Sequence, residues 1–339
     1  MKTSVVILNW NGRKLLEEFL PTVISHTVSD NAEVVVADNG STDNSVEFLK
    51  SNFSNIRLIT FEKNHGFAEG YNLALKQVDS EYVVLLNSDI ETTEGWLDTL
   101  IDYMDSNPEV SAVQPKILAQ SQKTHFEYAG ASGGFIDRYG YPFCRGRILG
   151  NVEEDKGQYD SVTPIFWATG ACLCIRSKDF FDVGGLDGRF FAHMEEIDLC
   201  WRLNSRGYII KCIPKSTVYH VGGASLAMES PRKTYLNFRN NLLMIYKNVP
   251  EHRFVPVFAM RFFLDILAFV HFIVQGKISN AMAVLGAFRD FLKMKPSFKA
   301  DRKENINKSV TKHISSIYNK SILWDFYTRG KRKYSQVFK

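Results

Sequence analysis

The chain has 339 residues, of which 45% are hydrophobic and 23% are charged. This balance excludes a disordered chain, and the length predicts one large globular domain or two. The five cysteines are odd in number and show no CxxC pair or zinc-ligand spacing, so we expect reduced thiols in a cytosolic compartment.

The net charge of +4 hides an uneven distribution along the chain. Residues 1–230 contain 20 Lys and Arg against 31 Asp and Glu, whereas residues 231–339 contain 21 against 6. A basic region could bind nucleic acid, anionic lipid or an acidic protein. Because apolar residues are interleaved with the basic ones over 254–292, we expect a membrane surface and no nucleic acid. The alternative is an ordinary helical subdomain with a basic solvated face.

Apolar runs and helical periodicity alternate through the first 110 residues. The runs at 3–8, 33–37, 56–60 and 82–86 predict strands, and apolar residues at helical spacing separate them. This alternation indicates an α/β fold with a mostly parallel sheet covered by helices on both faces. We expect the N-terminal run to be a first strand and not a signal peptide, because Asn9, Asn11 and Gly12 end it early.

The following segments are less regular. A helix is predicted around 96–104, and strands are predicted near 111–118, 165–175 and 208–213. Segment 119–163 is rich in glycine and predicts a long irregular loop, of a length that more often serves function than decoration.

Two apolar segments lie near the C-terminus. The first, 255–274, is interrupted by Arg261, Asp265 and His271, so it falls short of the uninterrupted apolar run expected of a membrane-spanning helix. The second, 281–295, has the same mixed character. We therefore predict helices that lie in a membrane interface.

The sequence changes from alternating apolar runs and helical segments to basic segments with apolar helical periodicity, and this change divides the chain into two parts. We predict a first domain of residues 1–245 and a basic, amphipathic helical region of residues 246–339.

Polar side chains gather where the predicted strands end and where a later helix begins. They are Asn9, Asp38, the run Asn87, Ser88 and Asp89, and the group Glu195, Glu196 and Asp198. Ligands of open α/β sheets bind beyond the carboxyl ends of the strands. A hard cation such as Mg²⁺ or Mn²⁺ takes one or two carboxylates together with substrate phosphates, so Asp89 is the first metal candidate. An ordinary turn is the alternative for this run.

Six blocks of sequence together resemble glycosyltransferase family 2, of the GT-A type. They are SVVILNWNG, VVVADNGSTDNS, NHGFAEGYNLAL, YVVLLNSDIE, WATGACLCIR and FFAHMEEIDLCWRL, within about residues 3–245. Within the family, the chain looks most like the rhamnosyltransferase-like enzymes that build bacterial surface polysaccharides. The resemblance implies inverting transfer of a sugar, L-rhamnose among the candidates, from a nucleotide diphosphate to a hydroxyl of a lipid-linked or growing surface glycan.

Such an enzyme would work in the cytoplasm, peripherally on the inner face of the cell membrane. The resemblance implies that the nucleotide lies against Leu8, Asn9, Asp38, Asn64, Gly66, Asn72, Asn87 and Ser88. Asp38 would accept a hydrogen bond from the imide N–H of uracil or thymine. We therefore expect a UDP-linked or dTDP-linked donor before a GDP-linked one.

The same resemblance implies roles in catalysis. The metal, Mg²⁺ or Mn²⁺, would bind Asp89 and His220, with a structural histidine as the alternative for His220. Glu196 takes the position of the catalytic base, which is usually Asp, so its carboxylate sits one methylene further out. Glu195 is the fallback. The two neighbouring carboxylates would also repel each other and raise a pKa toward the range useful for a base.

Four further residues are candidates for contact with a sugar or with the diphosphate, and three of them have a second interpretation. Trp167, Gly170 and Asp198 are expected beside the donor or acceptor sugar, although Trp167 could belong to the core and Asp198 could orient the start of its helix. Arg239 could meet the diphosphate or form a surface salt bridge.

Two other functions stay open at this point. A sugar nucleotidyltransferase would need a Gly-rich, basic loop after the first strand, where this chain has only Gly12. A catalytically inactive carbohydrate-binding or scaffold protein would be favoured by loss of Asp89 or of the acidic pair, and both are present.

Overall fold

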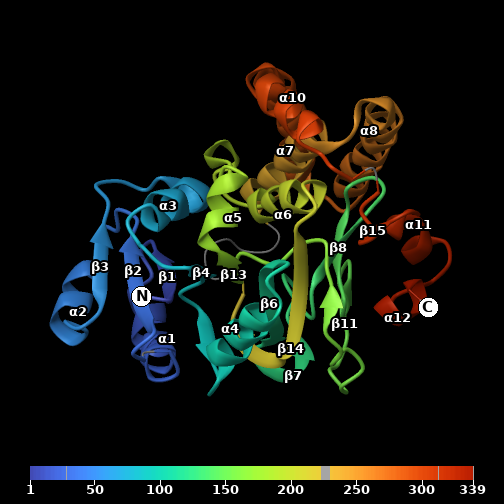
Figure 1. Cartoon of the computed structure of the whole chain (residues 1–339). Coiled ribbons are helices and arrows are strands. Elements are labelled where there is room, and N and C mark those ends of the chain that lie inside the picture. The colour runs from blue at the N-terminus through green and yellow to red at the C-terminus, as the bar shows by residue number, and fades with distance from the viewer. Residues whose placement is uncertain (28, 223–229, 312, 339) are drawn as a thin grey trace.

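The computed structural model describes residues 1–27, 29–222, 230–311 and 313–338. Its main sheet has the strand order β12-β14-β6-β13-β4-β1-β2-β3, with β5 added to β14 and β7 added to β6 (Figure 1). The strands are β1 (Thr3–Asn9), β2 (Ala32–Asp38), β3 (Arg57–Thr60), β4 (Tyr82–Leu86), β5 (Ile90–Thr92), β6 (Val110–Ala119), β7 (Gln122–Phe126), β12 (Thr163–Pro164), β13 (Cys172–Arg176) and β14 (Ile209–His220). Strands β1 to β4 are parallel, whereas β13 runs antiparallel to its neighbours β4 and β6.

Helices cover both faces of this sheet, which confirms the predicted α/β architecture. Helices α1 (Arg13–Ser25), α2 (Ser45–Asn52) and α4 (Trp96–Ser106) pack on one face, and α3 (Gly66–Leu75), α5 (Ser177–Asp182) and α6 (Glu195–Ser205) pack on the other. The four predicted N-terminal strands are confirmed. Their apolar runs contribute to both hydrophobic clusters because alternate side chains point to opposite faces.

The segment predicted as an irregular loop contains a second sheet instead. Its order is β11-β10-β9-β8-β15, from β8 (Gly134–Asp137), β9 (Pro142–Cys144), β10 (Arg147–Ile148), β11 (Asn151–Val152) and β15 (Ile317–Tyr318). These strands have two to four residues, too short for a periodic signal in the sequence. Strand β15 comes from the C-terminal part of the chain and runs parallel to β8.

The C-terminal tail completes this second sheet. The rings of Tyr334 and Phe338 lie 5.2 and 5.5 Å from the ring of Phe135. The backbone N–H of Tyr334 donates to Glu153 Oε1 at 2.9 Å. Helices α11 (Ile322–Tyr327) and α12 (Tyr334–Val337) therefore pack on residues that precede them by almost 200 positions.

The strand predicted over 165–175 begins only at Cys172. The preceding residues cross over to the second sheet, where Trp167 and Gly134 exchange backbone hydrogen bonds of 3.0 and 3.1 Å. Gly134 must be glycine, because a Cβ there would lie 2.1 Å from the indole of Trp167.

The C-terminal helices gather at one end of the molecule, at the top of Figure 1. They are α7 (Pro231–Asn248), α8 (Glu251–Val274), α9 (Ile278–Met294) and α10 (Lys299–Asn307). Helix α9 packs on α7 through Asn280, Ala281, Val284, Ala287 and Phe291, which are buried. The predicted domain boundary at residue 245 falls inside α7 and stays a prediction.

Helix α8 is long and apolar enough, by length and composition alone, to cross a membrane. The helix passes this test although Arg261, Asp265 and His271 interrupt its apolar run, and its placement in a membrane interface stays a prediction. Arg261 and Asp265 pair with each other at 2.9 Å, buried against the body of the protein, and the guanidinium lies 3.9 Å from the ring centroid of Tyr141. The charged side chains thus leave the outer face of the helix apolar.

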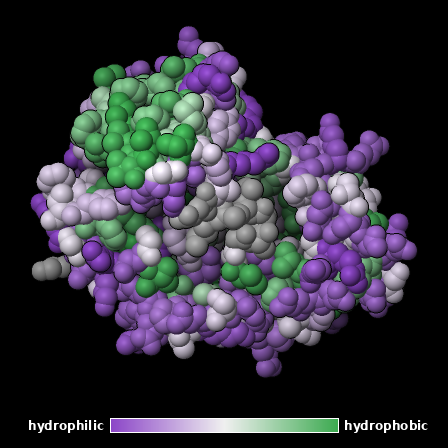
Figure 2. Space-filling model, turned by 180° about the vertical axis from the view of Figure 1, so that it is seen from behind, coloured by the Kyte–Doolittle hydropathy of each residue, from purple (hydrophilic) through white to green (hydrophobic). Residues whose placement is uncertain are grey.

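That outer face forms an apolar patch with part of α9, visible at the upper left of Figure 2. Its exposed residues are Val255, Met260, Phe262, Phe263, Ile266, Leu267, Val270, Ile273, Val274, Ile278, Met282, Leu285 and Leu292. We call this surface the α8/α9 patch. It brings together more exposed large hydrophobic residues than are usual on one face of a monomer.

Buried ionic contacts join α6 to α7. Asp198 is fully buried and accepts hydrogen bonds from Lys247 at 2.8 Å, Arg202 at 3.0 Å and Asn248 at 2.7 Å. Lys247 also donates to Asp187 at 2.7 Å. A buried charge is tolerated only when it is paired in this way.

We predict that Asp198→Ala lowers the free energy of unfolding by about 3 kcal/mol, because Lys247 and Arg202 lose a shared buried partner. Urea denaturation measures the change. The control is Lys308→Ala, which removes an exposed ion pair with Glu304 and should change the free energy by no more than about 0.5 kcal/mol. An Asp198→Ala protein as stable as the control would contradict this role.

Candidate functional site

The ends of β1 and β2 bring Asn9 and Asp38 together, because the two residues are paired in the parallel register. Asn9 Nδ2 donates to Asp38 Oδ2 at 2.9 Å, and the N–H of Ser41 donates to Asp38 Oδ1 at 2.9 Å. Each carboxylate oxygen keeps a lone pair for a further donor. Helix α2 begins only at Ser45, so Asp38 is not its N-terminal cap.

A network of amides follows at the start of α3. Asn39 Nδ2 donates to Asn64 Oδ1 at 3.1 Å and to the carbonyl of Gly66 at 3.0 Å. Asn64 Oδ1 also accepts the N–H of Gly66 at 2.7 Å. Gly66 has φ +79°, which disfavours any other residue, and a Cβ would lie 2.6 Å from the ring of Phe191. Asn39 was not among the predicted site residues, although its place directly after Asp38 pointed to it.

Leu8 and Asn72, two of the residues predicted to line the nucleotide, both contact other parts of the protein. Leu8 packs under α3, where a Cβ on Gly70 would lie 2.8 Å from its side chain. Asn72 Nδ2 donates to the carbonyl of Leu186 at 2.7 Å, and its Oδ1 accepts the N–H of Leu186 at 3.0 Å. The amide of Asn72 thus holds the backbone at Leu186.

Pairing of β5 with β14 brings Asp89 to His220. Asp89 Oδ1 lies 3.1 Å from His220 Nε2, and Asn87 Nδ2 lies 3.4 Å from the same nitrogen. On the other side of the ring, Glu127 Oε1 lies 3.4 Å from His220 Nδ1, within ion-pair distance. Glu127 was missed, because it follows β7 with no motif to mark it. Ser88, between Asn87 and Asp89, is partly exposed.

The carboxylates of Asp89 and Glu127 determine the protonation state of His220. Burial alone would lower the pKa of His220, but Asp89 and Glu127 outweigh it and raise the pKa to about 10. The pKa of Asp89 is lowered, because the hydrogen bond and charge of His220 outweigh the effect of burial. Without a metal, the pair is therefore an imidazolium between carboxylates.

This donor set can be compared with the needs of a divalent cation. In the described parts of the chain, no three His, Cys, Asp or Glu side chains converge on a single metal position. Asp89 and His220 could supply two ligands, and substrate phosphates commonly supply others to Mg²⁺. His220 Nε2 and Asp89 Oδ1 face each other at 3.1 Å, and this nitrogen and carboxylate together fit such a cation. Its binding through His220 would displace a proton.

A second pair of carboxylates opens helix α6. Glu195 is buried and Glu196 is partly exposed, and Oε2 of each is buried and has no hydrogen-bond partner among the residues that the structure describes. Burial raises the pKa of Glu196 to about 7. Burial, followed by the charge of Glu196, raises the pKa of Glu195 well above its usual range. The predicted shift is thus present, with burial ahead of repulsion as its cause.

Gly170 lies beside Glu196. A Cβ on Gly170 would lie 3.0 Å from Phe67 Cζ and 3.9 Å from Glu196 Cβ. The glycine therefore lets the backbone pass closely against the ring of Phe67, beside the first turn of α6.

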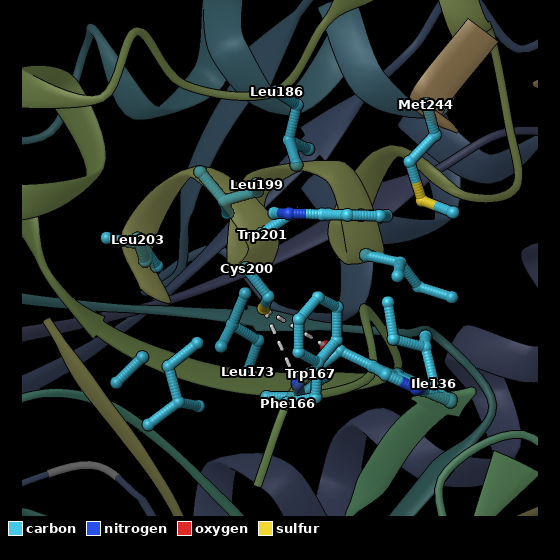
Figure 3. Close-up of a cluster of buried hydrophobic side chains, with 14 of the residues drawn as sticks. Ile136, Phe166, Trp167, Leu173, Leu186, Leu199, Cys200, Trp201, Leu203 and Met244 are labelled. Atoms are coloured by element: carbon cyan, nitrogen blue, oxygen red, sulfur yellow. Dashed lines mark hydrogen bonds between the residues drawn. The ribbon is translucent and has the colours of Figure 1, made fainter. Parts of the chain in front are cut away.

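Trp167 and Asp198 lie in the interior. Figure 3 shows Trp167 in a cluster of buried side chains that includes Ile136, Leu173 and Trp201. Its indole N–H donates to the carbonyl of Phe135 at 3.0 Å. Asp198 is occupied by the buried contacts with α7 described above. Trp167 is therefore a residue of the hydrophobic core, and the carboxylate of Asp198 is occupied by buried ion pairs.

Comparison with known proteins agrees with this arrangement. Residues 4–155 match the family described as glycosyl transferase family 2. The chain is 27% identical over 234 residues to an N-acetylglucosaminyl-diphospho-decaprenol L-rhamnosyltransferase of Mycobacterium tuberculosis, covering 64% of this chain and 75% of that protein.

Two solved structures share the fold. The first is S. aureus TarS 1-349 in complex with UDP-GlcNAc, with a TM-score of 0.55, 18% identity and coverage of 91% of this chain and 89% of that one. The second is a mannosyltransferase of Pyrobaculum calidifontis in complex with GDP-Man and Mn²⁺, with a TM-score of 0.52, 15% identity and coverage of 91% and 85%. The family match over residues 4–155, together with the GT-A-type sheet, identifies this part of the chain as a glycosyltransferase family 2 domain, of the family that transfers a sugar from a nucleotide sugar.

Proposed function

We propose that this enzyme transfers a sugar, with L-rhamnose as the first candidate, from a dTDP or UDP donor to a hydroxyl of a lipid-linked glycan, with inversion. The observation that carries the proposal is Glu196, a carboxylate with a pKa near 7 whose Oε2 has no hydrogen-bond partner among the described residues, whereas Asp89 is paired with His220. The Mycobacterium tuberculosis relative supports the choice of sugar and of acceptor class.

The chemistry divides between these two groups. Glu196 Oε2 takes the proton of the acceptor hydroxyl, whose oxygen forms a bond to the anomeric carbon. The bond from that carbon to the diphosphate oxygen breaks, and the diphosphate leaves with the electron pair. Because attack and departure occur on opposite faces, the configuration inverts. Mg²⁺ or Mn²⁺ held by Asp89 and His220 would neutralise charge on the diphosphate.

Recognition of the nucleotide is assigned to the edge of β1 and β2. Within the described part of the chain, the carboxylate of Asp38 accepts two hydrogen bonds, so it can also accept the imide N–H of uracil or thymine. The amides of Asn39 and Asn64 lie next to it, at the start of α3. This placement supports a UDP or dTDP donor before a GDP donor.

The α8/α9 patch is assigned to the inner surface of the cell membrane. Its apolar side chains would enter the boundary between headgroups and acyl chains. Residues 231–339, with 21 Lys and Arg against 6 Asp and Glu, would be attracted to anionic lipid. An enzyme held there would meet an acceptor whose lipid is anchored in the same membrane.

We predict that Glu196→Gln lowers kcat at least 100-fold, because the amide cannot accept the proton, while nucleotide binding is retained. Transfer from dTDP-L-rhamnose to N-acetylglucosaminyl-diphospho-decaprenol measures turnover. For the unchanged enzyme, kcat/KM should rise with pH through a midpoint near 7, since Glu196 must be ionised. The comparison is Glu195→Gln. Full turnover by Glu196→Gln, together with inactive Glu195→Gln, would move the base to Glu195.

We predict that Asp89→Asn removes the Mn²⁺-dependent part of nucleotide binding. A ligand that binds only the folded state raises the melting temperature, so thermal shifts with UDP, dTDP, GDP and ADP, each with and without Mn²⁺, measure it. Glu127→Gln should weaken Mn²⁺ binding about 10-fold to 100-fold, as loss of a group that orients a ligand does. Asp105→Asn is the control, since Asp105 bonds Lys2 and Tyr82 instead. Equal shifts for Asp89→Asn and the control would count against the metal site.

We predict that Phe263→Glu weakens binding to phosphatidylglycerol vesicles at least 10-fold, because a charge replaces an apolar anchor. Co-sedimentation measures the binding. A point variant is preferable to a deletion, since the C-terminal tail completes the second sheet. The matched control is Phe181→Glu in α5, where a similarly exposed Phe (42% against 54%) lies outside the patch. If both variants bind as the unchanged protein does, the α8/α9 patch is not the contact.

A further inference from the structure

The backbone that leads into Glu195 and Glu196 adopts an unfavourable conformation. Phe191, His193 and Met194 have φ of +68°, +70° and +72°, a region that residues other than glycine rarely enter. Each such residue costs on the order of 1 kcal/mol and persists only when the surroundings enforce it. Residues 189–194, the approach loop, therefore need external contacts to keep their shape.

Helix α7 supplies most of these contacts through two adjacent side chains. Asn240 Nδ2 lies 3.0, 2.8 and 2.8 Å from the carbonyl oxygens of Phe190, Ala192 and His193. Arg239 Nη2 donates to the carbonyl of Phe190 at 3.0 Å and lies 3.5 Å from that of Arg189. Arg239 Nε also donates to Asn240 Oδ1 at 2.9 Å, which fixes the orientation of the amide.

The start of α3 supplies the remaining contact. The N–H groups of Phe67 and Ala68 donate to the carbonyl of Phe191 at 2.8 and 3.3 Å. Every carbonyl from Arg189 to His193 thus meets a donor from α7 or α3. The carbonyl of Met194 then enters the α6 helix by accepting the N–H of Asp198. The contacts run without a gap up to the turn that carries Glu196.

These contacts exclude both sequence-based interpretations of Arg239. Its side chain is 9% exposed and its Nε and Nη2 are directed to Asn240 and to the approach loop. It is neither a surface ion pair nor a group directed at a diphosphate. Asn240 is completely buried.

We propose that Arg239 and Asn240 are positioning residues for the catalytic base, which hold the approach loop so that Oε2 of Glu196 stays sheltered from water and directed at the acceptor hydroxyl. This inference rests on the proposed function of Glu196. Neither side chain touches the reacting atoms. Their effect passes through the backbone of residues 189–194 to the first turn of α6.

The test compares Arg239→Met and Asn240→Ala with a matched control, Arg302→Met. Arg302 is also buried and donates to the carbonyls of Tyr246 and Val249, at the far end of the same helix. Each of the three variants removes a buried side-chain donor to backbone carbonyls that lie in α7 or pack against it. Only the first two remove donors to the approach loop.

We predict that kcat falls 10-fold or more in Arg239→Met and Asn240→Ala, while KM for the donor changes less than 3-fold. The pH midpoint of kcat/KM should fall below the value of the unchanged enzyme, because a looser loop lets water reach Glu196. Hydrogen exchange should accelerate within 189–196. Arg302→Met should lower the melting temperature without any of these changes.

The opposite pattern overturns the proposal. If Arg239→Met and Asn240→Ala lose melting temperature as Arg302→Met does but keep kcat, the pH midpoint and slow exchange in 189–196, the two residues only stabilise the fold. If either variant fails to fold, Arg239→Lys, which keeps one donor, is compared in its place and should lie between the unchanged enzyme and Arg239→Met. If Glu196→Gln is inactive while Arg239→Met and Asn240→Ala keep the unchanged kcat, only the positioning role is refuted. If Glu196→Gln is active, its role as the base is refuted.

Discussion

Buried polar contacts of helix α7 join the catalytic sheet to the C-terminal helices. Asp198 in α6 has no exposure to water, so its charge depends on Lys247, Arg202 and Asn248. About two turns earlier in α7, Arg239 and Asn240 donate hydrogen bonds to the approach loop. Helix α7 therefore contacts the start of α6 at two places: directly at Asp198, and through the approach loop that precedes α6. The C-terminal region is consequently part of the site's support, whatever it contacts outside the protein.

The environments of the carboxylates separate their chemistry. Asp89 lies beside a protonated imidazole, which keeps the pKa of its carboxyl low and the group charged. Glu196 lacks such a partner, and burial raises its pKa to about 7. One group is therefore suited to a cation and a diphosphate, and the other to accepting a proton near neutral pH.

Helix α8 resolves an apparent conflict between an apolar helix and the charges within it. Arg261 and Asp265 point inward and pair near Tyr141, so the outer face is left without charge. The same inward face ties α8 to the turn that follows β8. The C-terminal tail also packs on β8. The second sheet therefore contacts both the helix that carries the α8/α9 patch and the end of the chain.

The sequence by itself determined the sheet of β1 to β4 and the polar residues at its edge, because long apolar runs and the chain direction of parallel strands are local properties. The family blocks identified the enzyme class for the same reason. Only the tertiary structure decided that segment 119–163 forms a second sheet, since its strands are too short to leave a pattern. Likewise, Glu127 at His220 and Asn240 on the approach loop are contacts across 93 and 47 or more residues. Such partners depend on how distant elements pack, which no local spacing encodes.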